Sequence, residues 1–280
     1  MLDSYVFYQG KILEEEKVSI SIRSKAFNYG LGCFEGIRAF WNNKKRQLYV
    51  FRIDDHYKRL KRSCNTLNIN IPYSVDELRE WTIQLLKKNN FKTDVYIRPV
   101  AYKGAEDIAP RLNDNDNRLV IYCQPLGEFI RNPELRVKTS SWIRITNNSI
   151  PPSSKPTGGY LNSALASLDA VNSGYDEAVF VTQNGYICEG PGENIFLYGR
   201  GGLITPPIHD DILEGITRET VKLLAKKELK IQVTEQSITK PELYTANEAF
   251  FTGTAIGIKP IVEVDGRIIG TGQEGDGVKI

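Results

Sequence analysis

The sequence is poor in metal-binding residue types, and this shortage excludes one class of site. Two histidines and four cysteines occur in 280 residues, and the cysteines form no CxxC pair. No plausible zinc set can be assembled from them, so we predict no metal. Cys33, Cys64, Cys123 and Cys188 are widely spaced within apolar runs, which indicates reduced, mostly buried thiols of a cytoplasmic protein.

An excess of charge of one sign and a long apolar run are also missing. Lys and Arg total 36, Asp and Glu total 34, and the net charge of +2 is spread along the chain. Such a chain lacks the basic stripe of a nucleic-acid binder. No apolar run approaches the roughly 20 residues that cross a bilayer, and the first residues lack the plan of a signal peptide. We expect neither nucleic-acid nor membrane partners.

The chain instead alternates strand and helix patterns. Tyr5–Tyr8, a turn near Gln9-Gly10, and Val18–Ile22 predict a hairpin. Asp54 or Asp55 can cap a following helix. Further elements are a helix opened by the capping box Ser74-Val-Asp-Glu77, strands at 95–102 and 119–123, helices at 161–172 and 218–227, and a last hairpin across Asp265-Gly266.

This order of elements predicts two α+β domains. Residues 127–134, with sequence Gly-Glu-Phe-Ile-Arg-Asn-Pro-Glu, form the best linker candidate. We therefore assign residues 1–126 to a small N-terminal domain and residues 135–280 to a larger C-terminal domain.

Two segments are suited to binding an anion. Leu213-Glu-Gly-Ile-Thr-Arg218 precedes a helix, whose first N–H groups and dipole favour a phosphate. The alternative is that Thr217 simply caps the helix. Phe251-Thr-Gly-Thr-Ala255 ends a strand in a turn of small residues. Arg59 can hold a phosphate bidentately, or it can lie on a solvated helix face beside Lys58.

Three further segments carry residues that could take part in chemistry. In Lys155-Pro-Thr-Gly-Gly-Tyr160 a lysine stands ahead of two glycines that can let the chain turn. Glu189-Gly-Pro-Gly-Glu-Asn194 places two carboxylates around a turn, either under a heteroaromatic ring or simply exposed. Tyr96 and Arg98 share one face of a strand, which is either a carboxylate grip or a solvated face.

Taken together, the ordered motifs resemble one family. The order YGLGCFEGIR, HYKRL, YIRP, KPTGGYLNS, GYICEGPGENIF, LEGITR and FTGTA is similar to that of the branched-chain amino-acid aminotransferases. The resemblance runs from about residue 5 to about residue 275. It implies an α+β, two-domain fold type IV structure like that of D-amino acid aminotransferase, with a small N-terminal α/β domain and a larger C-terminal pseudo-barrel α/β domain.

The resemblance implies pyridoxal 5'-phosphate (PLP) as the cofactor and assigns roles around it. Lys155 corresponds to the lysine of the internal aldimine, Tyr160 to the partner of the ring hydroxyl, and Glu189 to the acid that pairs with the pyridine nitrogen. These three are the expected catalytic residues. Further cofactor contacts are expected from Arg59, Asn194, Leu213, Gly215, Ile216, Thr217 and Thr254.

The resemblance also implies the substrates and the assembly. Tyr96 and Arg98 correspond to the grip on the substrate carboxylate, helped by Thr254 and Ala255. Phe34 and Gly36 should line the apolar side-chain pocket. Tyr29 is expected to reach the partner subunit's site, which implies a homodimer or a dimer-based hexamer. The implied reaction is ping-pong transfer of the amino group of leucine, isoleucine or valine to 2-oxoglutarate, which gives 2-oxo acids and glutamate.

Other functions remain open from the sequence. A related fold type IV enzyme could act on D-amino acids or (R)-amines, or as an aminodeoxychorismate lyase. Ala255-Ile-Gly257 stands where Ala-Ala-Glu is commoner in the family, and this departure bears on the preferred substrate. A non-catalytic PLP-binding protein is a third possibility, against which Lys155, Tyr160 and Glu189 argue.

Overall fold

The structure is a computed structural model that describes residues 4–127, 132–199 and 201–275. The chain forms two compact units, which are Met1–Gly127 with Ser154–Gly158, and Glu128–Ser153 with Gly159–Ile280. Lys155 therefore belongs to the first unit, although the chain on both sides of it belongs to the second. The proposed linker includes residues 128–131, which lie outside the described residues, and the boundary drawn there stays a prediction.

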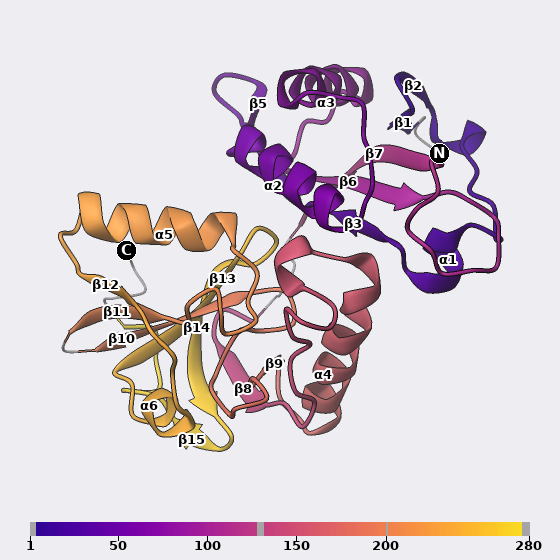
Figure 1. Cartoon of the computed structure of the whole chain (residues 1–280). Coiled ribbons are helices and arrows are strands. Elements are labelled where there is room, and N and C mark those ends of the chain that lie inside the picture. Colours follow the sequence, from indigo (N-terminus) through magenta and orange to yellow (C-terminus); the bar gives the residue numbers. More distant parts are fainter. Residues whose placement is uncertain (1–3, 128–131, 200, 276–280) are drawn as a thin grey trace. The chain divides into compact units, whose positions relative to one another are not determined.

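The first unit is built on an antiparallel sheet with two long helices (Figure 1). Its strands pair in the order β2-β1-β7-β6-β4-β5, and β3 also pairs with β6. The strands are β1 (Tyr5–Tyr8), β2 (Lys11–Glu14), β3 (Gly32–Phe34), β4 (Ile37–Asn42), β5 (Gln47–Val50), β6 (Val95–Lys103) and β7 (Asn117–Pro125). The helices are α1 (Lys25–Tyr29), α2 (Ile53–Thr66) and α3 (Val75–Asn89), with a 3-10 turn, η1 (Glu15–Lys17).

Side-chain alternation divides this sheet into two faces with different tasks. Val95 and Ile97 of β6 point into a core that α2 and α3 fill with Leu60 and Leu85, among others. Each such buried side chain contributes about 1.5–3 kcal/mol. Tyr96 and Arg98 alternate with these residues and so project from the other face. One face of the sheet thus holds the unit together, and the other presents polar and aromatic side chains.

The N-terminal hairpin forms, but with a different second strand from the one predicted. Tyr5–Tyr8 pairs with Lys11–Glu14, and Tyr8 stands opposite Lys11. Gln9 and Gly10 both have positive φ, 48° and 82°, which is the geometry of a two-residue hairpin turn. This tight turn selects the nearest residues as partners. The alternating pattern at 18–22 forms no strand, and none of its side chains is buried.

The helix starts were predicted with mixed success. The capping box that opens α3 is present, because Ser74 accepts from the Glu77 N–H and the Glu77 carboxylate accepts from the Ser74 N–H. The predicted cap of α2 is wrong. Arg52 is the N-cap residue of that helix, and Asp54 and Asp55 lie inside its first turn, where their charge favours the positive helix end.

The second unit is built on an eight-stranded mixed sheet, ordered β12-β11-β10-β13-β14-β8-β9 with β15 paired to β14. The strands are β8 (Leu135–Thr139), β9 (Glu177–Val179), β10 (Asn194–Gly199), β11 (Gly202–Thr205), β12 (Val233–Glu235), β13 (Glu248–Gly253), β14 (Gly257–Val264) and β15 (Arg267–Ile268). The helices are α4 (Tyr160–Asn172), α5 (Ile216–Lys227) and α6 (Lys240–Tyr244), and the single-turn helices η2 (Pro152–Ser154) and η3 (Thr157–Gly159) flank Lys155.

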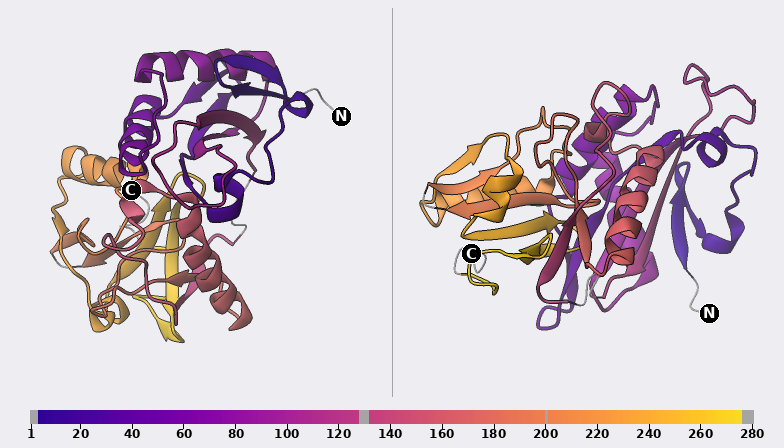
Figure 2. Two further views of the ribbon diagram at one scale, coloured as in Figure 1. Left: turned by 45° about the vertical axis from the view of Figure 1, so that its right-hand side comes forward. Right: turned by 90° about the horizontal axis from the view of Figure 1, so that it is seen from below.

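Both faces of the second sheet are covered. Along β10, Ile195 and Leu197 belong to one hydrophobic cluster, whereas Phe196 belongs to another, which includes Val221 and Ala225 of α5. Figure 2 shows α4 running beside β8 and β9, with which it is in contact. Within the described part of the chain, no helix has both the length and the apolar character that a membrane crossing requires.

Candidate active site

Lys155 lies in a strained backbone conformation within the first unit. Its φ is +44°, a left-handed value that lysine rarely adopts, and a proline follows it, which restricts it further. The Lys155 carbonyl accepts from the Phe34 N–H at 3.3 Å, and Lys155 Nζ lies 5.0 Å from the centre of the Phe34 ring. Backbone strain of this kind is concentrated at functional sites.

The two glycines after Lys155 act differently from the expectation. Neither Gly158 nor Gly159 has a positive φ, so the turn is made at Lys155 itself. Gly158 serves close approach instead, because a Cβ built at Gly30 would lie 2.7 Å from the Gly158 Cα. The hydroxyl of Thr157 donates to the Gly30 carbonyl at 2.6 Å. These contacts fix the lysine segment against β3 and the turn before it.

Four of the predicted substrate residues form one cluster in the first unit. Arg98 Nη2 donates to the Tyr96 hydroxyl at 2.8 Å, and the Arg98 guanidinium lies 4.3 Å from the Phe34 ring centre. Gly36 is required there, since a Cβ would lie 2.1 Å from the Tyr96 hydroxyl oxygen. Arg98 Nε is buried without a hydrogen-bond partner among the described residues. The cluster therefore presents a guanidinium beside an aromatic wall.

Tyr29 does not join this cluster within the chain. It is the last residue of α1, and its hydroxyl donates to the Ile108 carbonyl at 2.5 Å. Its side chain is exposed. The expectation that Tyr29 serves a partner subunit stays a prediction.

Arg59 is buried in the first unit, so the solvated-face alternative is wrong. Its Nε and Nη2 each donate to Glu35 at 2.7 Å, one to each carboxylate oxygen. His56 Nδ1 lies 2.8 Å from Glu35 Oε2. Burial alone would raise the pKa of Glu35, but the charge and hydrogen bonds of Arg59, aided by His56, hold that pKa well below its usual value.

Burial favours the neutral form of the His56 ring. Burial lowers its pKa more than the neighbouring Glu35 carboxylate raises it, and the charges of Arg59 and Lys155 lower it further. A carboxylate only accepts hydrogen bonds, so the proton of the neutral ring lies on Nδ1.

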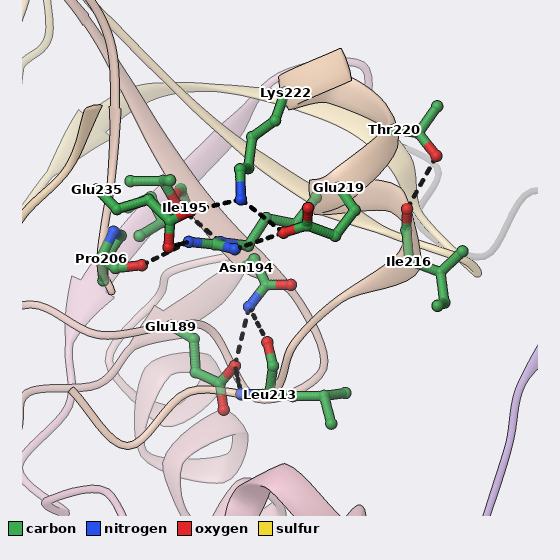
Figure 3. Close-up of polar contacts among 12 residues, drawn as sticks. Glu189, Asn194, Ile195, Pro206, Leu213, Ile216, Glu219, Thr220, Lys222 and Glu235 are labelled. Atoms are coloured by element: carbon green, nitrogen blue, oxygen red, sulfur yellow. Dashed lines mark hydrogen bonds and ion pairs between the residues drawn. The ribbon is translucent and has the colours of Figure 1, made fainter. Parts of the chain in front are cut away.

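In the second unit, Glu189 is held from several sides. Its Oε2 accepts from the Leu213 N–H at 2.9 Å and from Asn194 Nδ2 at 3.1 Å (Figure 3). Its Oε1 lies 2.6 Å from Arg144 Nη2. Glu189 and Glu193 are both buried, so the alternative of a turn flanked by exposed acids is wrong. The arrangement fixes the direction of the carboxylate and places a guanidinium beside it.

Asn194 and Gly215 belong to the same construction. Asn194 Nδ2 also donates to the Leu213 carbonyl at 2.9 Å, so the amide joins the carboxylate to the segment before α5. A Cβ at Gly215 would lie 2.0 Å from Asn194 Oδ1. Only glycine at position 215 leaves room for the Asn194 side chain in the position where it bonds Leu213.

The start of α5 has the features expected of an anion site. The helix begins at Ile216, two residues earlier than predicted, and its N-cap Gly215 offers no side-chain cap. Thr217 lies inside the first turn, so the simple-cap alternative is wrong. The first N–H groups of such a helix have no intrahelical acceptor.

Other predicted residues of the second unit lie at element ends. Tyr160 opens α4, and Thr254 and Ala255 form the turn between β13 and β14. Before that turn, the Thr252 hydroxyl is buried and has no hydrogen-bond partner among the described residues.

The arginine that ends the LEGITR motif has a structural role. Arg218 is fully buried. It donates to the Pro206 carbonyl at 2.9 Å, to Glu235 at 2.8 Å and to Glu219 at 2.8 Å. These bonds anchor α5 to β12 and to the residue after β11, and they hold the helix start in place.

Sequence reasoning missed three residues of these sites, His56, Glu35 and Arg144. His56 and Arg59 lie three apart on α2, on the stripe that also contains the buried Leu60, so helical periodicity could have indicated that both are buried. Glu35 appeared only within the motif YGLGCFEGIR, with no role of its own. Arg144 lies outside the motifs identified in the sequence, and nothing local marks it as the partner of Glu189.

Comparisons with known proteins agree on one family. The model of the class IV aminotransferase family matches residues 32–264. A probable branched-chain-amino-acid aminotransferase of Aquifex aeolicus is 45% identical over 272 residues, 97% of this chain and 88% of that protein.

Solved structures agree as well. The branched-chain aminotransferase of Thermoproteus uzoniensis with norvaline has a TM-score of 0.94 at 42% identity, covering 99% of this chain and 91% of that one. The branched-chain amino acid aminotransferase of Thermobaculum terrenum in its PLP-form has a TM-score of 0.94 at 34% identity, covering 100% of this chain and 92% of that one.

Proposed function

We infer the function from one premise: the chain belongs to the class IV aminotransferases. The predicted fold type IV structure is confirmed. The enzyme uses PLP and transaminates branched-chain amino acids, as the full-length relatives and solved structures support. The single observation that carries this function is the buried Glu189, ion-paired to Arg144 and bonded to the Leu213 N–H.

The residues present fit the cofactor. When bound, PLP supplies an electron sink for the negative charge that develops at the substrate α-carbon. Glu189 would accept a hydrogen bond from the protonated pyridine nitrogen, and its ion pair with Arg144 fixes the carboxylate in place. Tyr160 is proposed to bind the ring hydroxyl, and Leu213 to pack on one ring face.

Each unit offers groups that are suited to binding a phosphate. In the second unit these are the first N–H groups of α5 with the Thr217 hydroxyl, and the Thr254 hydroxyl. In the first unit Arg59 would add a guanidinium, the group best suited to a phosphate.

Lys155 is the proposed proton carrier. Its Nζ would first take the proton from the substrate α-carbon as general base. It would then donate that proton as general acid in the next step. The φ of +44° at Lys155 and the hydrogen bond from the Phe34 N–H to its carbonyl fix the backbone position from which the side-chain amine extends. Placement by a fixed backbone reduces the entropy that each transfer costs.

The substrate is proposed to bind at the cluster around Arg98. The Arg98 guanidinium and Tyr96 hydroxyl would hold the carboxylate. Phe34 and Gly36 would face a branched apolar side chain. Arg98 Nε is a buried donor without a partner among the described residues, which supports an acidic ligand beside it.

The test is a substrate panel with 2-oxoglutarate as acceptor. We expect L-leucine, L-isoleucine and L-valine to exceed D-alanine and (R)-1-phenylethylamine, with glutamate as the second product. A dominant D-amino acid or amine activity would overturn the assignment. Lys155→Ala should lower turnover by about 10²–10⁴, with an unchanged circular dichroism spectrum.

We also propose that the protein is at least a homodimer in the cytoplasm. Helix α4 carries Leu161, Leu168 and Val171 on an exposed stripe opposite its buried residues, and a face of this kind favours association. All four cysteines are free and buried, as suits a reducing compartment. Sedimentation equilibrium tests the assembly, and a monomer at micromolar concentration would exclude it.

A further inference from the structure

Because side chains alternate along a strand, the residues around Glu35 point to opposite faces of the sheet. Phe34 stands opposite Val100 in the pairing of β3 with β6, so it shares a face with Arg98. Cys33 belongs to the core that α2 covers, and Glu35, two residues on, points the same way. Glu35 thus faces α2 from between Phe34 and Gly36, which line the proposed substrate cluster.

The contact between Glu35 and Arg59 is bidentate and fully buried. The carboxylate takes one N–H from Nε and one from Nη2, both at 2.7 Å, and the Glu35 side chain has no solvent exposure. A planar guanidinium has five N–H groups in a rigid fork. Fixing two of them fixes the plane of the group and the direction of the other three.

His56 completes the arrangement from the same helix. Its Nδ1 is 2.8 Å from Glu35 Oε2, so the carboxylate is itself fixed by a donor. Glu35 Oε1 and Oε2 are then both committed to residues of α2. The backbone of Glu35 is also held, because its N–H donates to the Pro99 carbonyl at 2.9 Å. Nothing in this group can rotate without breaking another of its bonds.

We propose that Glu35 is a positioning residue for the cofactor's phosphate, because it orients the Arg59 guanidinium and is itself fixed by His56. This rests on the proposed function, in which Arg59 binds the phosphate. Glu35 also cancels the charge of Arg59, so a purely electrostatic role and a positioning role predict opposite effects. If Glu35 were only a counter-charge, its removal would strengthen anion binding. If it positions Arg59, removal weakens binding.

The experiment compares the affinities of the full-length apoenzyme for PLP and for pyridoxal, which lacks the phosphate. The ratio of the pyridoxal dissociation constant to the PLP dissociation constant, measured by equilibrium dialysis, isolates the contribution of the phosphate. We expect Glu35→Gln to reduce this ratio about tenfold, or about 1.4 kcal/mol, because glutamine turns a donor toward the guanidinium. A ratio that stayed at the wild-type value or rose would overturn the proposal.

Arg59→Gln separates this proposal from the function on which it rests. A reduced ratio in Arg59→Gln with a wild-type ratio in Glu35→Gln would refute only the positioning role. A wild-type ratio in Arg59→Gln would mean that Arg59 does not hold the phosphate, and the proposal would fail with that assignment.

Two further variants cover loss of folding. If Glu35→Gln does not fold, His56 carries the test, because asparagine keeps a donor near Nδ1 and leucine does not. His56→Leu should lower the ratio and His56→Asn should restore it, and equal ratios in the two would overturn the proposal.

Thr82→Val is the matched control, since it removes the buried hydrogen bond between Tyr57 and Thr82 without touching Arg59. If the ratio fell as much in Thr82→Val as in Glu35→Gln, the effect would come from the packing of α2, and the proposal would be overturned.

Discussion

Each unit of the molecule contains a buried pair of glutamate and arginine, and the two pairs are used in opposite ways. In the first unit the proposed ligand-binding member is Arg59, and Glu35 holds it. In the second unit the proposed ligand-binding member is Glu189, and Arg144 holds it.

This contrast indicates that chemistry does not fix which partner of an ion pair is functional. Burying both charges costs several kcal/mol of desolvation, and in return each fixes the direction of the other. The member that meets the ligand is then set by which side of the pair remains open to it. If the two pairs differ in this way, substitutions in the two pairs should change different measured quantities.

Among changes to the two pairs and their surroundings, the largest effect should follow from Glu189→Gln. An amide cannot hold the pyridine nitrogen in its protonated form, so turnover of leucine should fall about 10²–10³-fold. The ratio of pyridoxal to PLP dissociation constants should stay near the wild-type value. Steady-state kinetics and equilibrium dialysis on the same preparation give both numbers. If Glu189→Gln lost phosphate affinity and kept its turnover, the contrast between the pairs would be wrong.

Gly215→Ala should have the next largest effect. The added Cβ would meet Asn194 Oδ1 at 2.0 Å, and overpacking of this kind costs about 1–3 kcal/mol. Asn194 would move, and Glu189 would lose a donor. Gly192→Ala is the matched control, because a Cβ there meets nothing within 4 Å. Urea unfolding compares the two, and equal stabilities would count against the contact.

Arg144→Lys should lower kcat about tenfold, or about 1.4 kcal/mol. Lysine keeps the charge but not the planar fork, which also reaches the Ser163 hydroxyl at 3.3 Å and lies over the Phe180 ring. Steady-state kinetics with leucine measure the effect. A fully active Arg144→Lys enzyme would reduce the role of Arg144 to its charge alone, and only the first pair would then depend on orientation.

The smallest effect concerns pH. Burial lowers the pKa of His56, against the pull of Glu35, so the folded protein keeps this ring neutral while the unfolded chain takes up a proton below about pH 6.5. Stability should therefore fall as pH drops from about 6.5 to about 5.5, by at most about 1.4 kcal/mol per pH unit. His56→Asn should flatten this slope in urea unfolding. The exposed His209 supplies the control His209→Asn, which should keep the slope.

Much of the fold followed from local patterns. The capping box at Ser74 and the hairpin at Asp265-Gly266 are confirmed, because the residues that make them are close in sequence. The prediction of a second hairpin strand at Val18–Ile22 was wrong, because alternation identifies the buried face of a strand but not its partner strand.

The candidate sites followed from ordered motifs more than from any single residue. Tyr96, Arg98, Phe34 and Gly36 do lie together. Glu35 and Arg144 were missed because their partners are distant in sequence, and only the fold brings each pair together. The positive φ of Lys155 was equally invisible, since no local signal predicts a lysine in a conformation that suits glycine.

That conformation has a consequence for the lifetime of the protein. A left-handed lysine ahead of proline costs on the order of 1–3 kcal/mol, so the chain gives up stability at the residue proposed to carry the proton. A search for hardier variants that rewards a relaxed backbone would choose glycine or asparagine at position 155. It would select a longer-lived protein that no longer exchanges amino groups.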